Sequence, residues 1–281
     1  MKSFASLSVS VSLCFLLSTA AVCQPGSPEK ELSAADVMKK MDGQKQPDTM
    51  ISEMTMTLIG KNGDSRQRSV LTARKGKNNT IMWFLSPADW KGASFLSMMK
   101  NSVTSMWIYL PALSQEPSMV SSRGKKGSFM GSDFTYEDLE GRKLKDHDYK
   151  MLGTEKVLEK DCYVIESTPR PELANPSYSK IESWIWKDRL MPLKEKYYNK
   201  LGTLSKEQTI FELKNFKTYW IPMKIAMENL EKKQKTEIQF NNVQVDVSMD
   251  ETIFNQRSLK RIFNKSSLYK VSKSTTTAVD R

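Results

Sequence analysis

The sequence is poor in the residues that metal sites and most catalytic sites require. Its 281 residues include a single histidine, His147, and three cysteines, and no group of His, Cys and carboxylate residues has metal-ligand spacing. Neither a Gly-x-Ser-x-Gly elbow nor a glycine-rich phosphate loop occurs. We therefore expect no metal, no cofactor and no catalytic residue, with His147 exposed and structural. A hydrolase-like carboxylate pair drawn from Asp133, Glu137 and Asp138 is a weaker alternative.

Long apolar runs are also missing beyond the N-terminus. Lys2, an apolar stretch from Phe4 to Leu17 and the small residues that follow predict a secretory signal peptide over residues 1–23. No later run approaches the roughly 20 apolar residues of a transmembrane helix. We expect a periplasmic protein, and the alternative is a membrane-tethered lipoprotein that carries a lipid on Cys23.

Cysteine chemistry is correspondingly limited. Cys14 lies within the predicted signal peptide, and Cys162 lies in a strand-like run where we expect a buried, small apolar side chain. A disulfide between Cys23 and Cys162 is possible only if signal-peptide cleavage leaves Cys23 in the mature protein.

Positive charge and methionine, by contrast, are abundant. The formal net charge is +11, and the lysines are spread along the chain without a recognisable nucleic-acid-binding module. This excess favours an anionic partner such as a membrane surface and argues against nucleic acid. The 17 methionines suit a surface that adapts to apolar ligands, although they serve equally well as gap-filling core residues.

Alternating apolar and polar residues recur at short intervals from residue 52 onward. Met54, Met56 and Leu58 share one face of the first segment, and the following turn contains Asn62-Gly63, a strong hairpin signal. Links of hairpin length indicate an antiparallel sheet without βαβ units. We predict strands near residues 52–58, 66–73, 81–85, 94–99, 105–110, 149–157, 162–167, 181–186, 193–198, 203–216, 222–229 and 236–245.

The expected fold is of the α+β class and mainly antiparallel β. A sheet of this length should curl into an unclosed, half β-barrel. An amphipathic N-terminal helix over residues 32–41 and a short helical lid would cover it, above a concave apolar cavity of the kind that holds lipid or acyl chains. We expect one domain over residues 24–258 and a basic, disordered tail over residues 259–281.

One stretch, residues 127–139, fits neither a strand nor an ordinary loop, because it is strongly apolar without a period of two. We interpret it as a mobile, aromatic-faced flap in which Asp133 caps a short helix. As a lid, the flap would be held shut by apolar contacts and not by a dense polar network; the alternative is a crossover loop that packs as core. The lid residues are Phe129, Met130, Phe134, Tyr136 and Leu139, and the expected cavity wall comprises Met54, Met56, Leu58, Trp107, Tyr109, Trp184 and Trp186.

The flap, preceded by the segment from Trp107 to Pro111, resembles outer-membrane lipoprotein-sorting proteins of the LolA-like carrier superfamily. Shorter matches at residues 87–92, 186–202 and 250–254 extend the resemblance over most of the chain. It implies an unclosed antiparallel β-barrel with a helical lid that holds acyl chains in the periplasm, often beside a lipid export pump. Residues 112–117 lack the arginines of relatives and Arg123 is the nearest, so the arginine that latches the LolA lid has no assigned counterpart.

Three functions follow from these features. The leading hypothesis is a periplasmic carrier or chaperone that binds lipid or acylated lipoprotein cargo and delivers it towards the outer membrane, with an inner-membrane lipid export pump as a partner. The second is a cavity-based sensor or regulator of envelope lipoproteins, which normally needs a partner-binding domain for which this chain has little room. The third is an exported hydrolase.

Overall fold

The computed structural model describes residues 32–101, 103–261 and 263–268, so the predicted signal peptide, Cys23 and residues 269–281 lie outside the described residues. The described part contains one 13-stranded sheet with antiparallel neighbours throughout. The predicted strand ranges agree with it. Its strands are β1 Thr49–Ile59, β2 Ser65–Lys75, β3 Asn79–Ser86, β4 Ser94–Lys100, β5 Val103–Tyr109, β6 Ser118–Met119, β7 His147–Val157, β8 Lys160–Pro169, β9 Lys180–Trp186, β10 Met191–Tyr198, β11 Leu204–Phe216, β12 Tyr219–Asn229 and β13 Gln234–Val245.

Local sequence signals account for the strand pairing. β1 and β2 pair in unbroken register from Thr49–Lys75 to Ile59–Ser65. The turn between them places Gly63 at φ +84°, in the left-handed region that glycine adopts without strain. The remaining strands follow as hairpins, and one long-range pairing, β1 with β13, joins the two halves of the sheet.

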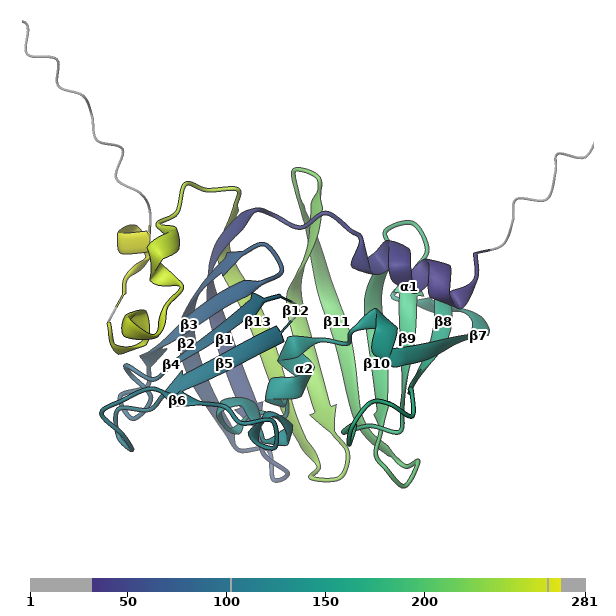
Figure 1. The fold of residues 1–281 in the computed structure, drawn as a ribbon, viewed down its shortest axis with the longest axis horizontal. Helices are drawn as coiled ribbons and strands as arrows, with labels where there is room; N and C mark the ends of the chain where they lie inside the picture. The colour runs from purple at the N-terminus through teal and green to yellow at the C-terminus, as the bar shows by residue number, and fades with distance from the viewer. Residues whose placement is uncertain (1–31, 102, 262, 269–281) are drawn as a thin grey trace, which may run out of the picture. The chain divides into compact units, whose positions relative to one another are not determined.

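The sheet is unclosed, as expected. Its order is β6-β5-β4-β3-β2-β1-β13-β12-β11-β10-β9-β8-β7, which leaves β6 and β7 as the two edges. The chain between Met119 and His147 must therefore cross from one edge of the sheet to the other, and this connection contains the flap. Figure 1 shows the sheet curling around this connection.

In the described part of the chain, two α-helices accompany the sheet (Figure 1). In α1, Ala34–Asp42, the side chain of Ser33 accepts a hydrogen bond from the backbone N–H of Asp36, and the helix packs against β7. Helix α2, Tyr136–Glu140, belongs to the flap. Short 3₁₀ turns complete the described structure: η1 Gly124–Lys126, η2 Phe129–Gly131, η3 Leu144–Asp146, η4 Glu251–Ile253, η5 Gln256–Lys260 and η6 Lys265–Leu268.

Apolar side chains cover both faces of the first half of the sheet. We call the face that contacts the flap the inner face and the opposite one the outer face. Residues after β13 pack on the outer face: Leu259 and Leu268 are fully buried there, and the Phe263 ring lies 4.5 Å from that of Trp83. The expectation of a disordered tail from residue 259 is therefore wrong for its described part, because these spaced apolar residues complete an outer core.

Candidate functional site

The flap folds as two short helical turns. Between η2 and α2, the backbone N–H of Phe129 donates to the carbonyl oxygen of Phe134 at 2.7 Å. Thr135 is the N-cap of α2 and forms a capping box with Asp138, with bonds of 2.7 and 3.1 Å. The expectation that Asp133 caps this helix is wrong, because its carboxylate is turned towards the sheet.

The flap side chains are packed against the inner face. Phe129, Met130, Phe134 and Tyr136 are each no more than 7% exposed. The Phe129 ring lies 5.1 Å from Phe95 of β4 and 5.5 Å from Tyr136, both edge-to-face. The flap therefore closes over an aromatic and methionine-rich layer.

The predicted wall residues of β1 belong to this layer. Met54 and Met56 are buried in the same apolar cluster as the flap aromatics, and Leu58 and Leu139 pack against its edge. The structure thus brings all five predicted lid residues together with the three predicted wall residues of β1.

The predicted wall residues of β5 lie elsewhere. Met106 and Ile108 face the flap cluster, so the alternating residues Trp107 and Tyr109 point to the outer face and pack against the outer core. The prediction that they line the cavity is therefore wrong, because they lie on the opposite face of β5.

The same holds for β9. Ile181 packs in the flap cluster, whereas Trp184 and Trp186 pack with Cys162 and Leu193 in a separate outer cluster. Neither tryptophan can contact a ligand beneath the flap. Cys162 is a free, fully buried thiol, as predicted.

An arginine that the sequence analysis did not single out holds the flap. Arg68 of β2 is 7% exposed and donates a hydrogen bond through Nη1 to the carbonyl oxygen of Met130. Its guanidinium carbon lies 3.5 Å from the ring centroid of Trp90. Met130 itself adopts φ +49°, a left-handed conformation that is strained for a non-glycine residue. Arg68 thus stabilises a strained turn of the closed flap.

Further polar contacts fix the flap to the second half of the sheet. Thr236 of β13 donates to the Asp133 carboxylate at 2.7 Å and accepts from the Asp133 N–H at 3.0 Å. Asp138, whose side chain is 3% exposed, accepts from Tyr178 at 2.8 Å and lies 3.2 Å from Lys206 Nζ. The expectation that the flap is held by apolar contacts alone is therefore wrong.

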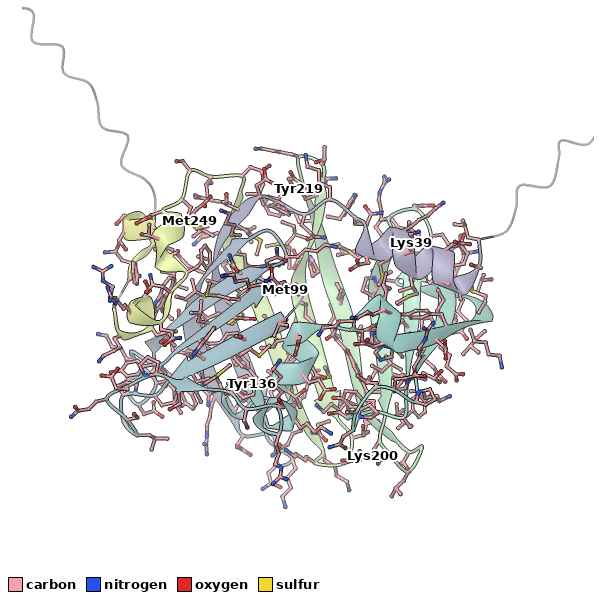
Figure 2. The ribbon with its side chains drawn as sticks, viewed as in Figure 1. Lys39, Met99, Tyr136, Lys200, Tyr219 and Met249 are labelled. Atoms are coloured by element: carbon pink, nitrogen blue, oxygen red, sulfur yellow. The ribbon has the colours of Figure 1, made fainter. Side chains whose placement is uncertain are left out.

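A cavity of about 260 Å³ lies beside α2 on the inner face. Figure 2 shows Met99, one of its lining residues, in the middle of the molecule above Tyr136. Its apolar surface comes from β1, β3, β4, β13 and α2, and its polar groups come from β2, the turn between β2 and β3, β3, β4, β5 and α2. The apolar lining residues are Met50, Met82, Phe95, Met99, Leu139 and Phe240, and the polar ones include Thr72, Arg74, Lys77, Thr80, Ser97, Thr104 and Glu140.

The single histidine is placed as a structural residue. His147 is 8% exposed, contrary to the expected exposure, and its Nδ1 lies 3.2 Å from the carbonyl oxygen of Lys143. Burial lowers the pKa of His147, so the ring is neutral at physiological pH. The carboxylates of Asp133 and Asp138 are held by the flap contacts described above, and that of Glu137 accepts from Ser177.

A buried ion pair lies further along the same side of the sheet. Arg142, in the chain after α2, pairs with Glu195 of β10, whose side chain is 10% exposed. Ser183 and Tyr197 both donate to the same carboxylate, at 2.8 and 2.7 Å. This network joins the flap connection to the second half of the sheet.

Comparison with known proteins places this geometry in a family. A model for a family of uncharacterized proteins matches residues 76–261, and no curated protein sequence matches the chain. A solved DUF1329 family protein from Desulfovibrio piger shares 28% sequence identity with this chain, with a TM-score of 0.74, and the match covers 80% of this chain and 97% of that one. A putative outer membrane lipoprotein-sorting protein domain from Vibrio parahaemolyticus is also 28% identical, with a TM-score of 0.73, and the match covers 81% of this chain and 98% of that one. This chain belongs to that family of uncharacterized proteins, and it shares its fold with the solved lipoprotein-sorting domain.

The LolA-like fold is also found at lower identity. A LolA superfamily protein from Nitrosomonas europaea is 20% identical, with TM-score 0.63 and coverage of 81% of this chain and 99% of that one. Within the described ranges of this LolA-like chain, no helix has the length and apolar character needed to cross a membrane. The same residues contain no group of three or more His, Cys, Asp or Glu side chains placed to hold a metal ion.

Proposed function

We propose that this LolA-like protein is a periplasmic carrier that shields the acyl chains of a lipid or a lipid-modified protein. The chains would lie on the inner face, first in the cavity beside α2 and then beneath the flap. The protein would deliver them towards the outer membrane, after loading at an anionic membrane surface or from an inner-membrane lipid export pump. The net charge of +11 favours encounters with such surfaces.

The observation that carries this proposal is the continuity between the cavity and the apolar layer under the flap. Met82, Leu139 and Phe240 line the cavity and also pack against the flap cluster, and Phe95 belongs to both. An acyl chain that enters the cavity therefore meets the flap at its inner end. Methionine-rich walls can repack around chains of different length.

The cavity volume sets how much of a chain fits while the flap is closed. A methylene group takes up about as much space as a water molecule, roughly 30 Å³. The volume of about 260 Å³ then holds about eight such groups, half of a common membrane acyl chain. Full accommodation of a long chain requires the flap to move, so the flap acts as a lid in this proposal.

A cavity-filling substitution tests the proposal. Met99→Trp introduces a large ring into the cavity, and Leu201→Trp introduces the same ring at a turn position that is 91% exposed. Binding of a fluorescent fatty acid should weaken by tenfold or more in Met99→Trp and stay unchanged in Leu201→Trp. Mass spectrometry of gently purified wild-type protein should detect co-purifying phospholipid or acylated peptide. If the two variants bind the fatty acid equally and no lipid co-purifies, the proposal fails.

A further inference from the structure

The cavity beside α2 contains a cationic side chain for which the described residues supply no counter-charge. Arg74 of β2 is half-buried and lines this cavity. Among the residues that the structure describes, none forms an ion pair with Arg74 or accepts a hydrogen bond from it. Buried and half-buried charges in proteins are normally paired, so this arginine calls for an explanation.

The other charged residues that line the cavity already have partners. Lys77 at the rim lies 3.5 Å from the carboxylate of Asp42, and Glu140 of α2 lies 2.6 Å from Lys125 Nζ. Each pair is close to neutral. Arg74 therefore gives the cavity a net positive charge that an anionic ligand can neutralise.

A second polar group in the cavity also lacks a hydrogen-bond partner among the described residues. Thr104 of β5 is 8% exposed, and its Oγ1 finds no hydrogen-bond partner within the described ranges. Its backbone carbonyl oxygen accepts from Lys125 at 3.0 Å, so the strand is otherwise satisfied. A buried hydroxyl without a partner is uncommon in folded proteins and is consistent with a ligand oxygen as its missing partner.

We propose that this cavity binds an amphiphile with an anionic head group, in which a carboxylate or phosphate pairs with Arg74 and the acyl chain lies along the apolar side towards the flap. The inference rests on the proposed function, because it assigns the head group of the lipid that the carrier holds. The planar guanidinium forms two parallel hydrogen bonds with carboxylate or phosphate oxygens. A neutral lipid would leave the charge of Arg74 uncompensated.

The energetics of the ligand-free protein agree with this assignment. Burial lowers the pKa of Arg74, but an arginine stays protonated at any physiological pH. A desolvated cation without a partner opposes folding, so a merely structural role gives no reason to retain it. A role in ligand binding, in contrast, would explain why the protein retains Arg74 although the unpaired charge costs stability.

The test compares Arg74→Gln with Arg66→Gln, a control on the same strand and the same face. Arg66 is exposed and lies eight residues away, roughly 26 Å along the strand. The probes are dansyl-undecanoic acid and its uncharged methyl ester, measured by fluorescence titration. Oleoyl lysophosphatidic acid and mono-oleoyl glycerol serve as competitors, so that a carboxylate preference is distinguished from a phosphate preference.

Wild type and Arg66→Gln should bind the acid about ten- to a hundredfold more tightly than the ester, because a hydrogen-bonded charge pair is lost with the ester. Arg74→Gln should bind acid and ester equally and unfold at the same temperature as wild type or higher. If wild type binds both probes equally, or Arg74→Gln keeps the preference, the head-group assignment is wrong while the carrier proposal stands. If neither probe binds to wild type, both are wrong.

Discussion

Replacement of Arg68 by Met should loosen the flap without unfolding the sheet. The substitution keeps an unbranched side chain but leaves the buried carbonyl oxygen of Met130 without its donor and removes the stacking on Trp90. An unsatisfied buried acceptor costs about 1–3 kcal/mol. The opening equilibrium of the flap should therefore shift by about five- to 150-fold towards the open state. Arg66→Met, at an exposed position of the same strand, is the matched control.

Hydrogen exchange measures this shift directly. The amides of Phe129 and Tyr136, which bond to Phe134 O at 2.7 Å and Gly127 O at 3.3 Å, report on the flap. Their protection in Arg68→Met should fall by the factor above, and the amides of β1 should keep theirs. If both sets lose protection by the same factor, the flap opens only when the sheet unfolds and the reasoning is refuted.

Other substitutions test the remaining electrostatic assignments. Burial raises the pKa of the Asp133 carboxyl group and outweighs the hydrogen bond from Thr236, which lowers it. The folded state therefore binds the carboxyl proton more tightly than the unfolded state does. Stability should fall as the pH rises from about the usual pKa of 3.8 through the raised pKa. Urea titrations should show this slope in wild type and a flatter one in Asp133→Asn, whose amide oxygen still accepts from Thr236; an unchanged slope contradicts the assignment. Burial raises the pKa of the Cys162 thiol to about 11, so the native protein should resist Ellman's reagent at mildly alkaline pH until urea unfolds it, and rapid native labelling would show that the thiol is accessible. Glu195→Gln leaves Arg142 buried without its counter-ion and should cost roughly 3–5 kcal/mol in urea unfolding, whereas a loss below about 1 kcal/mol would mean that water screens the pair.

The strands could be predicted from the sequence because alternation is a local property, but the choice of face could not. Met54 and Trp107 both lie in alternating segments, yet one faces the flap and the other the outer core. Alternation identifies an inner face only where the opposite face is polar. Here the residues around Leu259 cover the outer face of the first strands, so both faces are apolar and the pattern does not distinguish them.

Contacts between distant residues account for the other differences. Arg68 and Met130 are 62 positions apart, and no local signal links an arginine in a strand to a carbonyl group in a turn. The helix cap is a different case, because Thr135 and Asp138 have the spacing of a capping box in the sequence itself. Asp133 does not have this spacing, and its hydrogen-bond partner Thr236 lies 103 positions away in the sequence.

The central claim, that the flap is a lid for long acyl chains, is tested most directly by locking it shut. Asp133→Cys with Thr236→Cys places two thiols where hydrogen bonds of 2.7 and 3.0 Å already join the flap to β13. Each single substitution and the reduced double variant serve as controls for the lost hydrogen bonds. The probes are fluorescent octanoyl and palmitoyl lipids, one matched to the cavity of about 260 Å³ and one too long for it.

The account predicts that oxidation of the double variant abolishes binding of the palmitoyl lipid and leaves binding of the octanoyl lipid intact. Reduction of the disulfide should restore binding of the palmitoyl lipid. Palmitoyl binding of equal strength in the oxidised and reduced proteins would contradict it, because the flap would then be a fixed wall of the site and not its lid.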